Sequence, residues 1–235
     1  MKKLSLLLLL IYLYKNAFSQ KPIASGVVIY KVKIHPKVTA IDHAKQIRFP
    51  EFQKKINRLL ENVQYTLKFN DHESLFTADV SMSLEGEDGF TQLAQALAKS
   101  DQVYYVNTQQ KKLLVQQYFL GENFLISQST SDLKWTLIDE SKNIGEFTCY
   151  KAITQKPKSG PIEKNREYLT YTAWYCPSIP VSFGPFEFHS LPGLIIALSI
   201  GNHTYQATQV LLKRAYIHLT KPSKGTTITQ KNLTL

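Results

Sequence analysis

Residues 146–155, EFTCYKAITQ, and residues 166–176, REYLTYTAWYC, indicate most directly how this chain folds. Both runs are rich in Thr, Tyr and other residues that favour β-structure, so each is predicted to form a strand. The residues between them, KPKSGPIEKN, are polar and contain two prolines and one glycine, which is typical of a loop. A hairpin folded about this loop has three facing pairs: Thr154 with Tyr171, Ala152 with Ala173, and Tyr150 with Tyr175.

The N-terminal residues 1–19 have the pattern of a cleavable signal peptide. Two lysines precede an apolar run over residues 4–14, and Ala17 and Ser19 place small residues before Gln20. The apolar run is shorter than the roughly 20 residues that a membrane-spanning helix needs. We therefore predict export with cleavage between Ser19 and Gln20, no membrane span in the mature chain, and a single domain over residues 20–235.

The only two cysteines, Cys149 and Cys176, face each other in the same hairpin register. Because an exported protein meets oxidising conditions, we predict a disulfide between them. Closing this loop would stabilise the fold by roughly 3–4 kcal/mol if the gain is the lost entropy of the unfolded chain. The alternative is two free, buried thiols, and the spacing excludes a C-x-x-C redox motif.

The formal net charge of +10 raises the question of a nucleic-acid partner. Three of the lysines leave with the predicted signal peptide, and the others are scattered singly or in pairs. There is no concentrated basic stripe or recognition motif, so the sequence predicts no nucleic-acid partner.

Outward from the hairpin, hydrophobic alternation predicts many short strands, and helical spacing predicts one or two helices. The strands are expected over residues 26–34, 63–70, 73–80, 102–107, 112–120, 123–127, 135–138, 194–200 and 204–213, and the helices over 49–62 and 90–99, the second of which could instead be a mobile insertion. The tail from Lys221 is expected to be polar and frayed. The fold class is therefore mainly β (α+β), a curved antiparallel sheet or partial barrel, similar by fold analogy alone to lipoprotein-carrier half-barrels.

The region from Trp135 to Leu198 resembles the GLPGLI family, which comprises exported proteins of Gram-negative bacteria whose role is not established. Four ordered segments carry the resemblance: WTLIDESKNIG from Trp135, FTCYKA from Phe147, TAWYCPSIP from Thr172 and SLPGLI from Ser190. The residues that match the family motifs are Trp135, Trp174, Gly184, Pro185, Leu191, Pro192, Gly193, Leu194 and Ile195. The resemblance implies export and supplies no mechanism.

The name-giving motif can be interpreted physically. Pro192 and Gly193 are the preferred central pair of a type II turn. Ser190 stands where the family has its first glycine, which suggests that this position does not need a positive φ here. The three phenylalanines nearby, Phe183, Phe186 and Phe188, are expected to cover an end of the barrel. The segment is interpreted as a structural corner, with a binding lip as the alternative, and both tryptophans as core residues.

The search for chemistry finds no nucleophile elbow, zinc motif, phosphate loop or dinucleotide fingerprint, so no catalytic residue, metal or cofactor is predicted. The six histidines have no metal-ligand spacing. Glu187 and His189 would share a side of an extended segment and could form an acid/base pair, although two solvated loop side chains are the simpler interpretation. Asp139 and Glu140 are interpreted as turn residues.

Two classes of function follow from the sequence. The first is a non-enzymatic envelope or secreted module that binds or carries an apolar ligand, a lipidated partner or a peptide. The second is a hydrolase-type enzyme that uses Glu187 and His189. A third class, a structural partner in envelope assembly that binds another envelope protein, would show an exposed apolar patch without a cavity.

Overall fold

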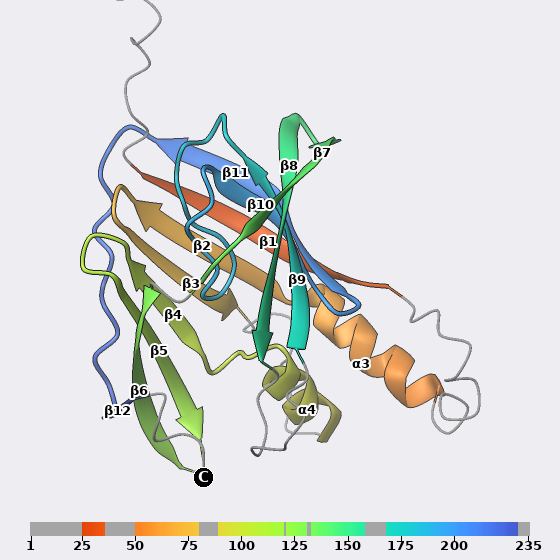
Figure 1. The fold of residues 1–235 in the computed structure, drawn as a ribbon. Coiled ribbons are helices and arrows are strands. Elements are labelled where there is room, and N and C mark those ends of the chain that lie inside the picture. Colours follow the sequence, from red (N-terminus) through yellow and green to blue (C-terminus); the bar gives the residue numbers. More distant parts are fainter. Residues whose placement is uncertain are drawn as a thin grey trace, which may run out of the picture.

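The structure is a computed structural model that describes residues 25–35, 50–79, 89–119, 121–130, 133–157 and 168–229. The predicted signal peptide lies outside these residues. Within them, twelve strands form one curved sheet that stays open, and two helices accompany it (Figure 1). No helix in this part of the chain is long and apolar enough to cross a membrane.

The elements follow the chain in this order: β1 (Ser25–Ile34), α3 (Pro50–Asn62), β2 (Gln64–Asn70), β3 (Glu73–Asp79), α4 (Gly89–Leu97), β4 (Val103–Asn107), β5 (Lys112–Phe119), β6 (Glu122–Ser129), β7 (Thr136–Ile144), β8 (Phe147–Pro157), β9 (Tyr168–Cys176), β10 (Leu194–Ile200), β11 (His203–Lys213) and β12 (Thr226–Thr229). The order across the sheet is β12-β6-β5-β4-β3-β2-β1-β11-β10-β9-β8-β7. Neighbouring strands are antiparallel except β12, which pairs with β6 in parallel. The predicted mainly β fold is confirmed, as a mixed rather than purely antiparallel sheet.

The predicted hairpin is confirmed residue for residue. β8 pairs with β9 through Tyr150–Tyr175, Ala152–Ala173 and Thr154–Tyr171. Cys149 and Cys176 lie one step further along and are both fully buried, but they are free thiols here, so the predicted disulfide is not formed in this structure. The disulfide stays a prediction, and so does the export on which it depends.

The main core lies on the concave side of the sheet. In β1 the buried side chains Val28, Tyr30 and Val32 alternate with the exposed Lys31 and Lys33, as predicted for a strand with one wet face. α3 begins at a proline, which is favourable in the first turn of a helix. It packs Ile56 and Leu60 into the core beside β1. α4 forms where a helix or a mobile insertion was expected, and it packs against α3.

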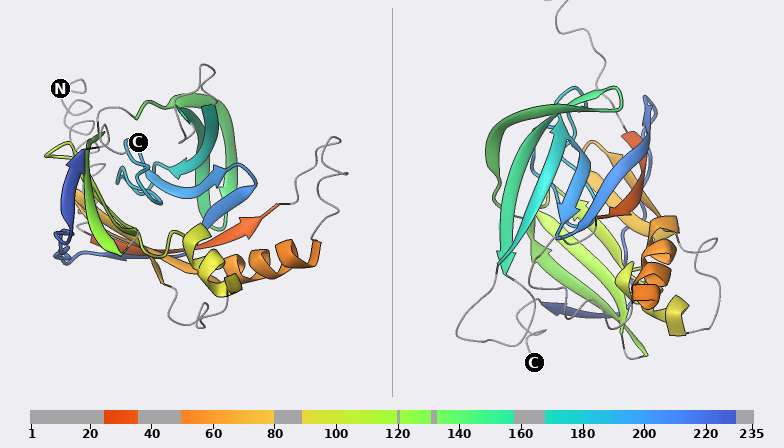
Figure 2. Two further views of the ribbon diagram at one scale, coloured as in Figure 1. Left: turned by 90° about the horizontal axis from the view of Figure 1, so that it is seen from below. Right: turned by 90° about the vertical axis from the view of Figure 1, so that its right-hand side faces the viewer.

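Residues 177–193, which connect β9 to β10, form a compact irregular segment that we call the plug. It lies within the curve of the sheet (Figure 2, left). Its phenylalanines Phe183, Phe186 and Phe188 are each at most 3% exposed and belong to the main core. Backbone bonds tie its base to β10, since Leu194 N–H donates to Ile179 O and Ile195 N–H donates to Phe183 O, both at 3.0 Å. The three rings therefore fill the concave side, instead of covering an end of a barrel as predicted.

The turn at Pro192 differs from the predicted type II turn. Gly193 N–H donates to Leu191 O at 2.8 Å, which closes a three-residue γ-turn centred on Pro192. A proline suits that central position because its ring fixes φ. Gly193 is needed for space, since a Cβ there would lie 2.3 Å from the carbonyl oxygen of Cys176.

The expectation for Ser190 is wrong. Its φ is +69°, in the left-handed region that glycine adopts most easily. The family's glycine therefore fits the conformation of this position better than the serine of this chain.

Residues 221–229, the described part of the tail that was expected to fray, form ordered structure instead. Residues 214–225, which we call the strap, lead from β11 to β12 at the far edge of the sheet (Figure 1). Ser25 Oγ donates to Ala215 O at 2.5 Å, and Lys224 N–H donates to Gln116 Oε1 at 3.1 Å. Hydrogen bonds made by side chains of distant strands hold this segment, which is why local sequence patterns do not reveal it.

Asp139 and Glu140 also depart from expectation. They lie inside β7, at an irregularity of its pairing with β8 between Ile138 and Ser141. The strand continues past them to Ile144, so they form a β-bulge and not a turn. Such bulges are common in edge strands, where they hinder pairing with other chains.

Candidate ligand-binding site

The ring of Phe186 sits in a cage of four aromatic side chains that come from four different strands. The ring centroids of Phe76 and Tyr205 both lie 4.8 Å from that of Phe186, and those of Tyr104 and Tyr65 lie at 5.5 and 6.1 Å. We call Tyr65, Phe76, Tyr104 and Tyr205 the cage. Tilted and edge-to-face arrangements at these distances are favourable aromatic contacts.

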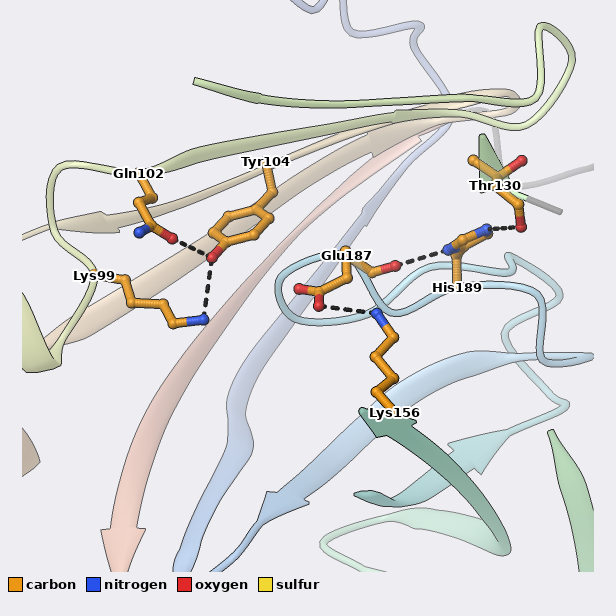
Figure 3. Close-up of polar contacts among 7 residues, drawn as sticks. All are labelled: Lys99, Gln102, Tyr104, Thr130, Lys156, Glu187 and His189. Carbon is orange, nitrogen blue, oxygen red and sulfur yellow. Dashed lines mark hydrogen bonds and ion pairs between the residues drawn. The ribbon is translucent and has the colours of Figure 1, made fainter. Parts of the chain in front are cut away.

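The next residue, Glu187, places a negative charge next to this aromatic region. Lys156 Nζ of β8 donates to Glu187 Oε1 at 2.9 Å (Figure 3). The two side chains keep 30% and 22% of their surface exposed, so solvent reaches the pair. Burial raises the pKa of Glu187, but the charges of Lys156 and Lys99 outweigh it and hold the pKa below its ordinary value of 4.5. Glu187 is therefore ionised at neutral pH, between two lysines.

Lys99 reaches the site from the end of α4. Ser100 N–H donates to Gln95 O and Lys99 N–H to Ala96 O, both at 3.1 Å, which is the Schellman pattern of a helix C-terminus. The residue at the position of Lys99 in this motif is usually glycine because its φ is positive, and here φ is +53°. The ammonium group lies 5.2 Å from the ring centroid of Phe186 and donates to the Tyr104 hydroxyl at 3.3 Å.

The hydroxyl groups of the cage are directed to hydrogen-bond partners. Tyr104 donates to Gln102 Oε1, and the hydroxyls of Tyr65 and Tyr205 bond to each other. Burial, together with the nearby Glu187 charge, raises the pKa of Tyr104 well above its ordinary value, and burial raises that of Tyr205 to about 12. The tyrosines stay neutral and present ring surfaces to Phe186, so the cage is apolar on its inner side.

His189 is buried at the base of the plug, and both of its ring nitrogens face backbone carbonyl groups. Nδ1 lies 2.7 Å from Glu187 O, and Nε2 lies 3.2 Å from Thr130 O (Figure 3). Burial lowers the pKa of His189 below its ordinary value of 6.5. The indole of Trp135 donates to His189 O at 2.7 Å, so the base of the plug is tied to the start of β7.

The hypothetical acid/base pair of Glu187 and His189 is not assembled. The Glu187 carboxylate pairs with Lys156, and the imidazole contacts the Glu187 backbone instead of its side chain. The turn over residues 185–188, closed by Phe188 N–H donating to Pro185 O, makes this segment bent rather than extended. The geometric assumption behind the pair therefore fails.

The family-motif residues serve the packing of this region. Trp135 and Trp174 are partly buried and pack against the core, as predicted. Leu191, Leu194 and Ile195 are fully buried. Gly184 lies against Ile195, where a Cβ would come within 2.6 Å of a side-chain carbon.

Sequence reasoning missed Lys99, Lys156 and the cage. Lys156 was assigned to a loop, yet it extends β8. The one local signal was the end of the 90–99 helix, where a lysine occupies the place that a terminating glycine commonly takes. The cage brings together strands far apart in the sequence, so no short pattern reveals it. Among the described residues no group of three or more His, Cys, Asp and Glu side chains could hold a metal ion.

Part of the chain is similar to a family without an established role. Residues 155–197 match a family described as "Protein of unknown function (Porph_ging)". This stretch runs from the end of β8 through the plug into β10, and it covers less than half of the chain. The match does not carry the GLPGLI name, which stays a resemblance. No curated protein matches the chain.

One solved structure is similar in fold to this chain, and a second aligns with it less well. The structure described as "Structure of PNGF-II in P21 space group" aligns with a TM-score of 0.53 and 14% identity, over 89% of this chain and 32% of that one. A second, "Structure of PNGF-II in C2 space group", has a TM-score of 0.49 and 14% identity over 83% and 28%. This chain thus spans about a third of the length of the first structure. At this identity the likeness concerns the fold alone.

Proposed function

We propose that the protein is an exported, non-enzymatic binding module whose ligand contacts Lys99, Lys156 and Glu187 beside the plug. The observation that carries the proposal is the partly exposed Lys156–Glu187 ion pair, set next to buried aromatic rings and to a second lysine. Two ammonium groups against one carboxylate leave a net positive charge. Such a border between apolar rings and cations suits an amphipathic ligand with an apolar part and an anionic head.

The lysines also lie over aromatic rings. Lys156 Nζ is 4.8 Å from the ring centroid of Phe188, and Lys99 Nζ is 5.2 Å from that of Phe186. These contacts hold each ammonium group close to an apolar surface, where a charge interacts more strongly than in bulk water. An anionic head group is therefore attracted to the place where its apolar part meets the rings.

The contacts favour binding over hydrolysis. An acid/base mechanism requires a carboxylate that orients an imidazole, and both partners are engaged elsewhere. The alternative of an envelope-assembly partner rests on a different surface, where Phe52, Leu93 and Leu97 of α3 and α4 are 38–51% exposed. That surface predicts self-association or capture of another protein, and it makes no use of Lys156.

The test is titration of the chain over residues 20–235 with dodecanoic acid, followed by isothermal titration calorimetry. We expect saturable binding that weakens at least about tenfold in Lys156→Met and in Lys99→Met, which keep the apolar stem and remove the charge. Lys151→Met is the matched control, because Lys151 lies on the same strand and makes a 2.9 Å ion pair with Glu140 away from the plug. Equal affinity for the uncharged methyl ester, or equal losses in all three variants, would contradict the proposed site.

A further inference from the structure

The backbone of the plug is held in unfavourable conformations around Phe186. Phe186 has a φ of +57°, which is rare for a bulky side chain, and Ser190 has +69°. Lys99, whose amine faces the Phe186 ring, has +53°. Four non-glycine residues of the described chain have positive φ. Two of them, Phe186 and Lys99, meet at the cage, and a third, Ser190, lies in the same plug. Backbone strain of this kind clusters at functional sites, and it persists where the surrounding structure enforces it.

The base and the tip of the plug are held in different ways. The base has backbone bonds: Ser190 N–H donates to Ser182 O at 3.0 Å, Ile195 N–H to Phe183 O, and the Trp135 indole to His189 O. The tip, residues 185–187, is held by the Phe186 ring in the cage, by the Lys156–Glu187 pair and by the contact of Glu187 O with His189 Nδ1. The first two attachments are of the kinds that an amphipathic ligand offers, an apolar group and an anion.

We infer that the tip is a displaceable part of the plug, and that Phe186 occupies the cage as a stand-in for the apolar end of the ligand. This inference rests on the proposed function, and it specifies the positions that the two ends of the ligand occupy. The apolar end enters the cage of Tyr65, Phe76, Tyr104 and Tyr205, and the anionic end takes the place of Glu187 beside Lys99 and Lys156. The ligand class is an amphipathic anion whose apolar end has at most about the cross-section of a phenyl ring.

The chemistry of the cage fits this class. Its hydroxyls are engaged with each other or with Gln102, so a ligand meets ring faces and no unpaired polar group. When the tip moves out, Phe186 loses its ring contacts, and relief of its left-handed backbone offsets part of that loss. The closed form is then the major state, and the ligand binds a minor open state with an affinity reduced by the fraction that is open.

The test compares Phe186→Ala with Phe183→Ala. Both remove a buried phenyl ring from the plug, but the Phe183 ring packs on Phe69, outside the cage. We expect Phe186→Ala to bind dodecanoic acid, followed by isothermal titration calorimetry, about tenfold more tightly than the unaltered chain, because the competing ring is gone. Phe183→Ala should bind within about twofold of the unaltered chain. Equal or weaker binding by Phe186→Ala would overturn the inference.

A second measurement uses the unaltered chain, in case Phe186→Ala fails to fold. Saturation with the fatty acid should speed hydrogen exchange at the Phe188 amide, whose bond to Pro185 O closes the tip, while the Ile195 amide at the base stays protected. Binding that depends on Lys156 but leaves exchange at Phe188 unchanged would overturn the displaceable tip and leave the proposed function standing. Absence of binding in both the unaltered chain and a folded Phe186→Ala would overturn both.

Discussion

The plug and the strap are both irregular segments that cover a face of the same sheet, but they are held in opposite ways. The plug packs three phenylalanines on the concave side, has left-handed backbone at Phe186 and Ser190, and leaves a charged pair partly exposed. In the strap, the left-handed residue among those described is Gly225, which adopts this conformation without strain.

The strap covers a small second cluster on the other face of the sheet. Tyr105, Leu114 and Leu219 are each at most 6% exposed and lie outside the main core. Tyr105 and Leu114 are directly paired across β4 and β5. Beside them Glu73 accepts hydrogen bonds from Tyr105 and Asn107, and Asn70 faces Tyr216 Oη at 2.9 Å and Ile217 O at 3.2 Å.

The differences between the plug and the strap distinguish a segment with a functional role from one with a structural role. A segment that only closes a fold is expected to relax into satisfied hydrogen bonds and unstrained backbone, as the strap does. A segment that keeps strain and exposed charge next to a filled apolar cage is better explained by a ligand.

The largest change in stability is expected from a disulfide at the base of the plug, where Cys176 ends β9. Incubation with oxidised glutathione should join Cys149 to Cys176, lower the intact mass by two hydrogens and stabilise the protein by roughly 3–4 kcal/mol in urea unfolding. Burial raises the pKa of Cys149 to about 11, so the reaction should be slow in the folded state and fast during refolding. A mass equal to that of the reduced chain after oxidative refolding would rule out the bridge, and Cys176→Ala is the control without it.

A substitution at Gly193, where the plug joins β10, should change the stability nearly as much. Gly193→Ala places a Cβ 2.3 Å from Cys176 O, so we expect a loss of about 3 kcal/mol in urea unfolding. Gly201→Ala is the matched control, because its φ of +59° is unfavourable but nothing lies within 4 Å of the added atom. It should lose about 1 kcal/mol, which is the cost of the left-handed backbone alone. Similar losses in both variants would show that the close approach of Gly193 to Cys176 is not important.

These two regions also show how far the sequence could be interpreted. Alternation and one loop were enough to predict the register from Tyr150 to Tyr175, because facing strands joined by a hairpin have few alternatives. The position of Phe186 depends on contacts with four strands, and the path of the strap depends on Asn70 and Gln116, both more than 100 residues away. Ser190 misled the interpretation, because tertiary contacts impose on it a conformation that its residue type does not favour.

On the strap side, Asn70→Ala should cost about 2–3 kcal/mol. Asn70 is itself 1% exposed, and its side chain accepts from the amides of His72 and Glu73 and faces Tyr216 and Ile217 of the strap, so several part-buried hydrogen bonds are lost at once. Asn202→Ala, which removes a hydrogen bond to His35 O at the surface, should cost less than about 1 kcal/mol. We expect Asn70→Ala to leave fatty-acid binding unchanged. Weakened binding in this variant would show that the role of the strap is not only structural.

Mild acid should loosen the plug before the strap. The folded pKa of His189 is depressed, so the stability it supports is present above its unfolded value of 6.5 and is lost as pH falls below that value. The pKa of Glu73 is also lowered, because its hydrogen bonds from Tyr105, Asn70 and Asn107 outweigh burial, so its contribution is lost only as pH falls below 4.5. Lys156 and Glu187 face His189 with opposite charges.

Hydrogen exchange can follow this order directly. Between pH 6.5 and 5 the amides of Ser190 and Ile195, which donate to carbonyl groups of the plug, should lose protection. Strap-side amides such as Glu73 should keep theirs after correction for the intrinsic pH dependence of exchange. His189→Gln should abolish the difference. Simultaneous loosening of both segments near pH 4.5 would show that His189 does not control the plug.

The smallest change in stability is expected from substitutions at two lysines that have almost the same φ. Lys99 and Lys111 have φ values of +53° and +50°, and Lys111 lies in the turn between β4 and β5. Replacement by glycine relieves a cost of roughly 1–2 kcal/mol but adds freedom to the unfolded chain, so Lys111→Gly should gain about 0.5–1 kcal/mol. Lys99→Gly should gain less, because it also loses the hydrogen bond to Tyr104.

The two lysine variants differ most in binding. Lys99→Gly should weaken fatty-acid binding at least about tenfold while the protein becomes no less stable, whereas Lys111→Gly should bind unchanged. Unchanged or higher stability together with weaker fatty-acid binding is the expected result if the strained Lys99 is retained because its side chain binds the ligand. If Lys99→Gly binds as well as the unaltered chain, the left-handed lysine is an accident of helix termination, and the plug loses one of the features that set it apart from the strap.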